Sequence, residues 1–282
     1  MKNIETLVED IYQVIDDGFE PTIEAVEDLV EIVAHSVVRQ FSPKYREDRN
    51  TLRMSNIGKP VCQLWHEANG SPKEKLDAHV RIKFLFGDII EALIIYLAKE
   101  AGHKVTDEQK EVKVDGITGH MDCKIDGVTV DIKSASSFAF KKFNEGTLAD
   151  DDPFGYFAQI SGYATAEGEQ EAGFVAMDKQ LGKLTYMPVI EMDMLDVPKR
   201  IKLLKEIVKQ DTPPTRCFDA VPDGKSGNMK LPVNCSYCTF KETCWADANN
   251  GDGLRKFLYS NGPRWLTAIE RIPDVKEITN DG

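Results

Sequence analysis

The chain of 282 residues lacks several features that would assign it to a special class of protein. It has only 13 prolines, and it has no internal repeat and no low-complexity tract. No apolar run approaches the roughly 20 residues that a membrane-spanning helix needs. The first five residues also lack the basic and then apolar layout of a secretory signal peptide. We therefore expect a globular, cytoplasmic protein.

An excess of basic residues is also missing. The 35 lysines and arginines face 47 acidic residues, which gives a net charge of −12. This balance excludes a protein that coats nucleic acid through its overall charge. It still allows a local nucleic-acid site, because clustered carboxylates hold divalent cations that reverse the sign of the charge there.

The hydrophobic content of 41% is sufficient for one substantial core or two closely joined domains. Hydrophobic periodicity predicts an α/β fold with an antiparallel start. The expected elements are a helical pair within residues 1–50, a core helix at 76–101, three strands within 110–134, a helix at about 154–166, strands at 172–177 and 184–190, and a helix at about 194–210. Residues 214–244 are rich in Gly, Pro and Cys, and residues 271–282 have the composition of a frayed tail.

Residues Asp126 and Gly127 stand between two alternating runs, which predicts a two-residue hairpin loop. This loop fixes the register of the strands on either side. Ile125 then lies opposite Val128, and Cys123 lies opposite Val130, with the Met121 and Ile132 pair beyond them. One face of the hairpin is therefore wholly apolar and is expected to lie on the core.

The same register places polar residues on the other face. Asp122 falls opposite Asp131, and His120 falls opposite Lys133, with paired Cβ atoms about 5 Å apart. Two carboxylates at that separation repel each other unless a cation joins them. Mg²⁺ or Mn²⁺ prefers oxygen ligands, so the two aspartates and a backbone carbonyl would form an open site in which Lys133 orients or activates a water. The plain alternative is the solvent face of an amphipathic hairpin.

The residues around this hairpin strengthen the interpretation as a site. Gly119 to Asp122, followed by Asp131-Ile-Lys133, resembles the signature of the PD-(D/E)XK nuclease superfamily. Gln159 to Tyr163 is similar to the Q-x-x-x-Y motif of its RecB-type branch, and Phe84 to Glu91 is similar to the first motif of the family. The four motifs occur in the family's order.

The resemblance implies a restriction-endonuclease-like core, a mixed sheet flanked by helices, with an N-terminal helical region and a C-terminal cysteine-cluster cap. Glu91, Asp122, Asp131 and the backbone carbonyl of Ile132 are expected to bind the divalent metal. Gln159 and Tyr163 share one helix face and are expected to present an amide and a phenol to substrate or to Lys133. The remaining candidate substrate contacts are His120, Lys141 and Lys142, with Lys73 and Lys75 as further members of a basic track.

Cys235, Cys238 and Cys244 supply three soft metal ligands within a short segment, and Cys62 is the natural fourth. The segment from Met54 to Trp65 resembles the opening segment of iron-sulphur nucleases of the same branch, namely the CRISPR-adaptation exonucleases and AddB-type domains. That resemblance implies a [4Fe–4S] cluster. Zinc remains the alternative, because four thiolates also bind Zn²⁺. Cys123 and Cys217 are interpreted as packing or surface residues.

The resemblance as a whole implies a metal-dependent DNA exonuclease of recombination, repair or phage DNA processing, in a bacterial or phage-infected cell. Its expected partners are DNA with a free end and a helicase or recombinase. The alternatives are a structure-specific endonuclease on the same fold and a catalytically idle DNA-binding or partner module. The expected division of the chain is a helical region at 1–75, the nuclease core at 76–212 and the cluster region with its tail at 213–282.

Overall fold

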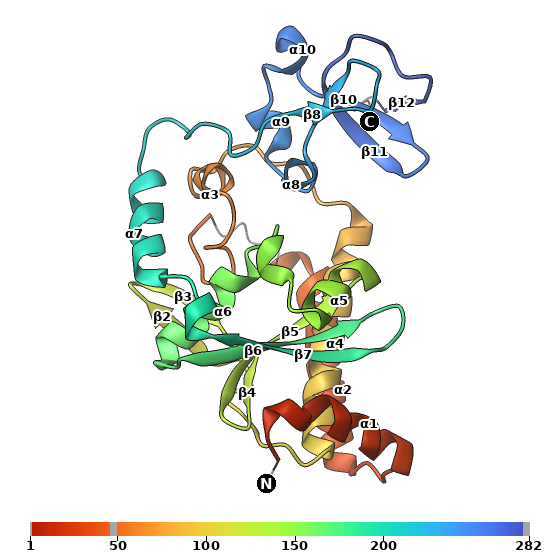
Figure 1. The fold of residues 1–282 in the computed structure, drawn as a ribbon, viewed down its shortest axis with the longest axis vertical. Helices are drawn as coiled ribbons and strands as arrows, with labels where there is room; N and C mark the ends of the chain where they lie inside the picture. The colour runs from red at the N-terminus through yellow and green to blue at the C-terminus, as the bar shows by residue number, and fades with distance from the viewer. Residues whose placement is uncertain (1, 46–49, 279–282) are drawn as a thin grey trace. The chain divides into compact units, whose positions relative to one another are not determined.

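The computed structural model describes residues 2–45 and 50–278 (Figure 1). The chain forms two compact units, one comprising Met1–Gly58 and Asp77–Leu203 and the other Lys59–Leu76 and Leu204–Gly282. Among the described residues, no helix combines the length and the apolar character needed to cross a membrane.

The first unit is built on a five-stranded mixed sheet with the order β1-β4-β5-β6-β7. Strands β5 and β6 are parallel, and the other neighbours are antiparallel. The strands of this unit are β1 (Val105–Thr106), β2 (Glu111–Val114), β3 (Ile117–His120), β4 (Cys123–Ile125), β5 (Val128–Ala135), β6 (Glu171–Asp178) and β7 (Leu184–Ile190). The expected α/β class with a mixed sheet is confirmed.

Helices flank this sheet on both sides. Figure 1 shows α5 and α6 on one side and α1 on the other. The helices that begin in this unit are α1 (Leu7–Asp17), α2 (Ile23–Phe41), α4 (Ala78–Glu100), α5 (Ser137–Asn144), α6 (Tyr156–Glu167) and α7 (Val197–Ile207), with short 3-10 turns at Ile4–Thr6, Pro43–Tyr45, Leu148–Asp150 and Glu191–Asp193. The predicted helices agree with these, apart from α5, for which the sequence predicts no helix.

The core on one face of the sheet joins α1 and α4 to the hairpin strands. It contains Leu7 and Ile11 of α1 and Ile94 of α4, packed with Cys123 and Ile132 of the hairpin. The apolar face predicted for the hairpin is thus buried. Each fully buried side chain of this size contributes roughly 1.5–3 kcal/mol.

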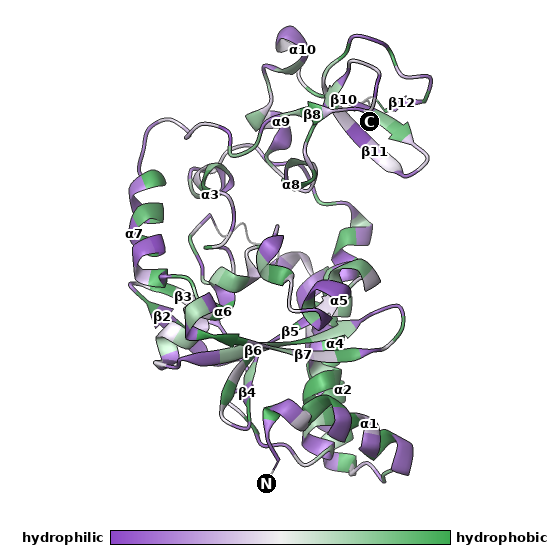
Figure 2. Cartoon of the chain, in the orientation of Figure 1, coloured by the Kyte–Doolittle hydropathy of each residue, from purple (hydrophilic) through white to green (hydrophobic). Residues whose placement is uncertain are grey.

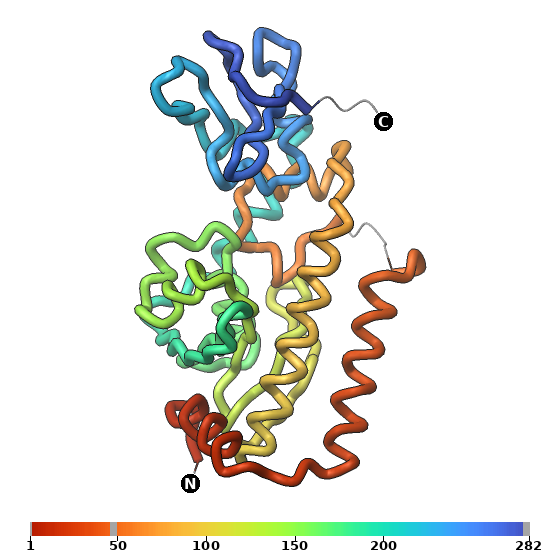
Figure 3. Tube along the Cα trace, turned by 90° about the vertical axis from the view of Figure 1, so that its right-hand side faces the viewer, coloured from red at the N-terminus to blue at the C-terminus, as the bar shows by residue number. Residues whose placement is uncertain are grey.

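Amphipathic spacing shapes the outer helices. In Figure 2, α7 shows alternating green and purple bands, because apolar and polar residues alternate along it. Val197 and Ile201 are buried, while Lys199 and Lys202 are exposed. Figure 3 shows α2 running beside α4. Two polar contacts join these helices: Gln40 Nε2 donates to Asp88 at 2.8 Å, and Arg39 pairs with Asp88 at 3.0 Å.

A buried histidine connects α1 to the loop of the β4–β5 hairpin. The His103 side chain exposes none of its surface. Its Nδ1 lies 2.7 Å from Oδ2 of Asp126 in the hairpin loop, and its Nε2 lies 3.2 Å from Oδ2 of Asp10 on α1. The other carboxylate oxygen of Asp126 accepts the backbone N–H of Lys104 at 3.0 Å. The contacts of Asp126 hold the first residue of the loop that sets the hairpin register.

The hairpin region contains four strands where the sequence predicted three. The predicted register holds from Cys123↔Val130 to Ile125↔Val128. Before Cys123 the chain bends, and His120 pairs with Glu111 of β2. The predicted pairing of His120 with Lys133 is therefore wrong. A second tight turn at Asp115 and Gly116, where both residues have positive φ, folds β2 onto β3 and takes His120 away from β5.

The second unit contains a separate five-stranded antiparallel sheet with the order β12-β10-β11-β9-β8. Its elements are α3 (Val61–Ala68), β8 (Val221–Pro222), β9 (Met229–Lys230), α8 (Val233–Ser236), α9 (Lys241–Cys244), α10 (Ala248–Gly251), β10 (Arg255–Tyr259), β11 (Gly262–Ala268) and β12 (Glu277–Ile278). The prediction of a frayed tail is wrong for residues 271–278, because β12 pairs with β10 and Arg255 binds Glu277 with two hydrogen bonds of 2.7 Å. Residues 279–282 lie outside the described residues.

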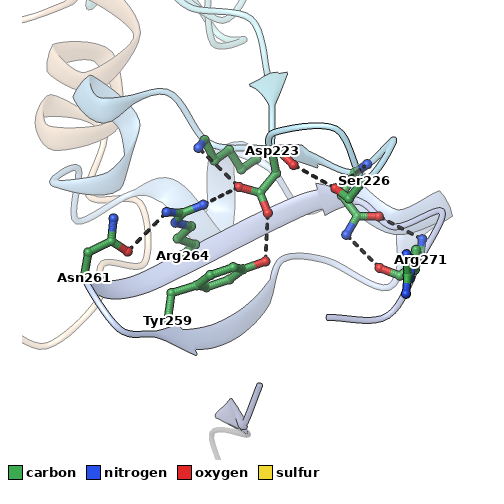
Figure 4. Close-up of polar contacts among 8 residues, drawn as sticks. Asp223, Ser226, Tyr259, Asn261, Arg264 and Arg271 are labelled. Carbon is green, nitrogen blue, oxygen red and sulfur yellow. Dashed lines mark hydrogen bonds and ion pairs between the residues drawn. The ribbon is translucent and has the colours of Figure 1, made fainter. Parts of the chain in front are cut away.

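A buried carboxylate organises one edge of this sheet (Figure 4). Asp223 accepts from Arg264 at 2.6 Å, from Tyr259 at 2.7 Å and from Lys230 at 3.2 Å. Burial alone would raise the pKa of Asp223, but these hydrogen bonds outweigh it and lower the pKa below its ordinary value. The network stabilises the folded unit when Asp223 is ionised.

We expect Asp223→Ala to lower the free energy of unfolding by about 3 kcal/mol at pH 7, because three donors lose a buried acceptor. Since the folded pKa is depressed, this contribution is complete above about pH 4 and disappears as the pH falls through the folded value. Urea denaturation at pH 7 and pH 3 measures both effects. The exposed Asp219→Ala is the control in the same unit, and an equal loss in the two variants would contradict the prediction.

Candidate active site

Strand β5 carries the central pair of the candidate site. Val130 and Ile132 lie in the core shared with α4, and the alternation of the strand directs Asp131 and Lys133 to the opposite face. Asp131 is completely buried, and its Oδ2 forms an ion pair with Lys133 Nζ. Burial raises the pKa of Asp131, and the neighbouring Lys133 opposes that shift without cancelling it. An ionised Asp131 therefore needs more positive charge than Lys133 supplies.

Asp122 enters the site at the bend before β4. Its Oδ2 accepts the backbone N–H of Ile132 at 2.6 Å. This side chain therefore bonds to β5 just beyond Cys123, where the backbone pairing of β4 with β5 ends. Burial raises the pKa of Asp122 well above its ordinary value, and the carboxylates of Asp131 and Glu91 raise it further. The three acids are thus electrostatic neighbours.

Glu91 reaches the site from α4. It accepts from Gln109 Nε2 at 2.5 Å. Burial raises the pKa of Glu91 to about 7, with further contributions from Asp88 and Asp131. A cavity of about 420 Å³ reaches Glu91 and is lined by residues of α2, the following turn and α4, together with Gln109. This cavity is large enough to admit a ligand to one edge of the acidic group.

The raised pKa of Glu91 predicts a pH-dependent stability of the metal-free protein. Its folded pKa lies above the unfolded value, so the stabilising contribution is complete below about pH 4.3 and is lost as the pH rises through about 7. In the presence of a chelator, we expect the melting temperature to fall less in Glu91→Gln than in the wild type as the pH is raised from 4.5 to 8. The matched control is Glu31→Gln, an exposed glutamate of α2. Parallel melting curves for Glu91→Gln and the wild type would contradict this expectation.

Lys133 is enclosed by residues of α6. Its Nζ lies 3.4 Å from Gln159 Oε1 and 4.8 Å from the centre of the Tyr156 ring. Gln159 Nε2 in turn contacts the Tyr163 hydroxyl at 2.9 Å. Burial would lower the pKa of Lys133, but Asp131 and Asp122 outweigh it and raise the pKa. Lys133 therefore remains a cation at neutral pH.

Tyr156 and Asp152 are neighbours of the site that the sequence does not predict. The Asp152 carboxylate accepts the backbone N–H groups of Gly155 and Phe157 at 2.9 Å, which caps the start of α6. Its charge also contributes to the raised pKa of Asp131. Asp152 stands three residues before Gly155, the N-cap of α6, so it is not at the usual capping position. The placement of Tyr156 over Lys133 depends on the packing of α6.

The motif glycine Gly119 is explained by close packing. A Cβ atom at this position would collide with the Met54 side chain and lie 3.1 Å from Cε1 of Tyr163. The chain passes Tyr163 at this distance only because Gly119 lacks a side chain. Gly119 thus helps to bring the bend that carries Asp122 close to α6.

The acidic group has one property that suits a hard cation. Both carboxylate oxygens of Asp131 are buried, and neither has a hydrogen-bond partner among the described residues; the short contact with Lys133 is an ion pair without hydrogen-bond geometry. A buried carboxylate without hydrogen bonds is costly, and a bound metal ion would offset more of that cost than the single ion pair with Lys133 does. Within the described residues, no three His, Cys, Asp or Glu side chains already converge as a metal site. Binding of a cation would therefore require Glu91 or Asp122 to turn toward Asp131.

The remaining predicted contact residues of the first unit have other partners. The His120 side chain is exposed and lies 3.8 Å from Glu111. On α5, Lys141 pairs with Glu145 at 3.7 Å, and Lys142 donates to the backbone carbonyl of Asp151 at 2.9 Å. Lys73 and Lys75 belong to the second unit.

The second unit brings together the cysteines predicted to bind a cluster. Cys62, Cys235, Cys238 and Cys244 line one small cavity of about 20 Å³. Burial raises the pKa of the Cys235 thiol to about 11, and burial likewise raises the pKa of Cys238 and Cys244. The chemistry of the donors suits a soft cation. As packed, the thiols among the described residues do not converge into a preformed metal site.

Cys217 contacts one member of this group, although the sequence predicts a packing or surface role for it. Its Sγ accepts the backbone N–H of Cys62 at 3.4 Å. A thiol–thiol hydrogen bond with Cys217 is the largest contribution to the raised pKa of Cys62. Cys217 is distant in sequence from both Cys62 and the Cys235–Cys244 segment, so the sequence spacing does not indicate its contact with Cys62.

Comparisons with known proteins give low similarities. A scan against protein-family models finds no match, and a search of curated proteins finds none. Among solved structures, the chain is similar to the crystal structure of SSO0001 with a TM-score of 0.41 and 17% identity, covering 79% of this chain and 96% of that one. An alkaline exonuclease from Laribacter hongkongensis gives a TM-score of 0.34 and 15% identity, covering 56% of this chain and 90% of the exonuclease.

A phage-related exonuclease from Haemophilus somnus gives a TM-score of 0.38 and 14% identity, covering 56% of this chain and 90% of that one. Structural neighbours of this chain thus include exonucleases. Similarities at these TM-scores do not identify a function, and the case for one comes from the residues of the site.

Proposed function

We propose that this chain is a divalent-metal-dependent DNA nuclease, and specifically an exonuclease that hydrolyses phosphodiester bonds. The observation that carries the proposal is the fully buried carboxylate of Asp131, which has the ion pair with Lys133 but no hydrogen bond among the described residues, beside the acidic Asp122 and Glu91. An ion pair that served only stability would leave fewer buried oxygens unsatisfied. Acidic oxygens with one adjacent lysine suit phosphodiester hydrolysis at a hard cation.

The chain's residues would divide the chemistry between them. Asp131 and Asp122, with Glu91 and the Ile132 carbonyl as further ligands, would hold Mg²⁺ or Mn²⁺. The ion, when bound, supplies positive charge that stabilises the phosphate oxygens in the transition state. Lys133 keeps its proton and would therefore orient the attacking water and stabilise negative charge rather than act as a base. Gln159 would hold Lys133 in place through its Oε1, with Tyr163 fixing the amide of Gln159.

The second part of the proposal concerns the cysteines. We assign to the thiol group of the second unit a stabilising metal site, with a [4Fe–4S] cluster as the first choice and Zn²⁺ as the alternative. The group connects α3 near one end of this unit's sequence with the segment from Cys235 to Cys244. A metal on these thiols would cross-link two segments that are distant in the chain.

The nuclease proposal is tested by incubating end-labelled linear DNA with the purified protein and Mg²⁺ or Mn²⁺, with EDTA as a control. We expect metal-dependent loss of label whose rate falls about 100-fold in Lys133→Met, because the variant lacks the cation that stabilises negative charge. The matched control is Lys124→Met, which removes an equally buried lysine from the same hairpin. The two side chains are 16% and 15% exposed, and Lys124 pairs with Glu167 and Glu169 instead of Asp131.

Circular DNA separates the two kinds of nuclease, because only an endonuclease cuts a substrate without an end. Cleavage of the circle would overturn the exonuclease assignment and leave the hydrolytic site in place. If the folded protein supplied with metal cleaves no DNA, the proposal that it is a nuclease would be wrong. A DNA-binding or partner module would then be favoured.

A further inference from the structure

An aromatic side chain beside the candidate active site is left half exposed. Phe154 exposes 51% of its surface and stands two residues before Tyr156, the first residue of α6. The centre of its ring lies 5.5 Å from the centre of the Tyr156 ring, and the centre of the Tyr156 ring lies 4.8 Å from Lys133 Nζ. Two contacts therefore connect an exposed phenylalanine to the lysine of the candidate site.

The backbone around Phe154 is held in place. Gly155 has a positive φ of 75°, and its Cα packs so closely on the backbone of Gly58 that a Cβ atom on either glycine would collide with the other. Asp152 accepts the backbone N–H groups of Gly155 and Phe157, each at 2.9 Å. Phe154 is therefore exposed on an ordered loop, so a ligand that stacks on its ring would order little more of the chain.

A second exposed ring lies on the neighbouring helix α5. Phe138 exposes 76% of its surface, and Lys142 Nζ lies 5.3 Å from the centre of its ring. Lys142 also pairs with Asp151 at 2.5 Å, three residues before Phe154. The two phenylalanines are thus linked through Lys142 and this loop, and Figure 1 shows α5 and α6 on the same side of the sheet.

An unpaired nucleobase fits these rings better than a phosphate group does. Asp151 pairs with Lys142, and Glu145 pairs with Lys141, so each lysine of α5 already has a carboxylate partner. An aromatic ring stacks on any base, because every base has a π face. In a duplex, neighbouring bases cover these faces except at the terminal pair. Exposed rings beside the site therefore favour an unpaired strand.

We infer that Phe154 is a stacking platform for an unpaired base of the DNA strand near the bond that is cut, with Phe138 as a further stacking position. The inference rests on the proposed nuclease function and names the form of its substrate, a single strand or an unwound end. Steps of 4.8 and 5.5 Å separate Lys133 Nζ from the Phe154 ring. A stacked strand covers this distance in about three nucleotides at roughly 3.4 Å each.

Binding of a fluorescent single-stranded oligonucleotide to the full-length protein, with Ca²⁺ as the only divalent ion added, tests the inference. A blunt duplex of the same sequence is the comparison. Phe154→Ala removes the ring, Phe154→Leu keeps apolar bulk without a ring, and Phe154→Tyr keeps the ring. The control is Ile15→Ala, which removes a side chain that is 47% exposed from α1, on the other side of the sheet.

We expect the wild type to bind the single strand more tightly than the duplex. Phe154→Ala and Phe154→Leu should each bind the single strand about 10-fold more weakly, whereas Phe154→Tyr and Ile15→Ala should match the wild type. The dependence of the affinity on salt concentration should be the same in Phe154→Ala as in the wild type, because stacking releases no counterions.

Single-strand binding by Phe154→Ala at the wild-type affinity would overturn the inference, and so would a wild type that prefers the blunt duplex. If the wild type degrades DNA in either case, the nuclease proposal stands without the stacking platform. A protein that neither binds nor degrades DNA would overturn both.

Discussion

Asp131→Asn is expected to abolish metal-dependent DNA degradation while the fold is retained. Asparagine keeps the shape of the buried side chain but removes the charge that would hold the cation. Metal ions contribute several kcal/mol to transition-state stabilisation, and each 1.36 kcal/mol changes a rate tenfold. The rate should therefore fall by at least about 1,000-fold. End-labelled DNA degradation and Mn²⁺ binding by calorimetry measure the two losses together.

The control for Asp131→Asn is Glu111→Gln, which neutralises an exposed carboxylate on strand β2. This variant should degrade DNA at the wild-type rate. Circular dichroism and melting curves establish that Asp131→Asn is folded, since Lys133 loses its ionised partner in this variant. A folded Asp131→Asn protein that degrades DNA within tenfold of the wild type would exclude Asp131 as a metal ligand.

Cys235→Ala is expected to destabilise the metal-loaded protein by several kcal/mol, a loss that a chemical role alone would not cause. Metal-binding free energy contributes directly to folding when the ligands come from distant segments. Cys235 lines the same cavity as Cys62, which lies on α3 far earlier in the chain. Melting temperature and urea denaturation of the loaded proteins give the size of the effect.

Removal of the metal provides the comparison for Cys235→Ala. After chelation, the difference in the free energy of unfolding between the wild type and Cys235→Ala should become small, because both proteins then lack the metal. The residual difference should be about 1 kcal/mol, the cost of one small side chain in a partly buried site. A metal-loaded Cys235→Ala protein with the wild-type melting temperature would refute the proposed stabilising role of the site.

The sequence was most informative where local pattern and tertiary packing agree. The Asp126-Gly127 loop fixes the register of Cys123 to Val130, and the apolar alternation of this hairpin places Ile125 and Ile132 in the core. The same alternation puts Asp131 and Lys133 on one face of β5. The register failed beyond Cys123, because β3 pairs with β2 instead of extending β4. The turn at Asp115 and Gly116 causes this change of partner. The predicted pairing of His120 with Lys133 did not take that turn into account.

Other features depend on contacts that no local pattern records. The second sheet is made of strands as short as two residues, and such strands have too few positions to show a period. Cys217 meets Cys62 through tertiary contact, and its spacing from Cys235 resembles no metal motif. The burial of Asp131 could likewise not be predicted from the sequence, because the polar face of an isolated hairpin would be exposed to solvent. Packing of α6 against that face removes the solvent.

The buried contact between His103, Asp10 and Asp126 makes α1 part of the support for β5. Removing the first helix would withdraw Asp10 from an imidazole that has no access to water, and it would expose the apolar face of α4 at Ile94. Asp126 would then hold a histidine whose Nε2 has lost the neighbouring carboxylate of Asp10, at the loop from which the strand of Asp131 begins. A truncated protein would therefore lose hydrogen-exchange protection first along β4 and β5, at a distance from the residues deleted.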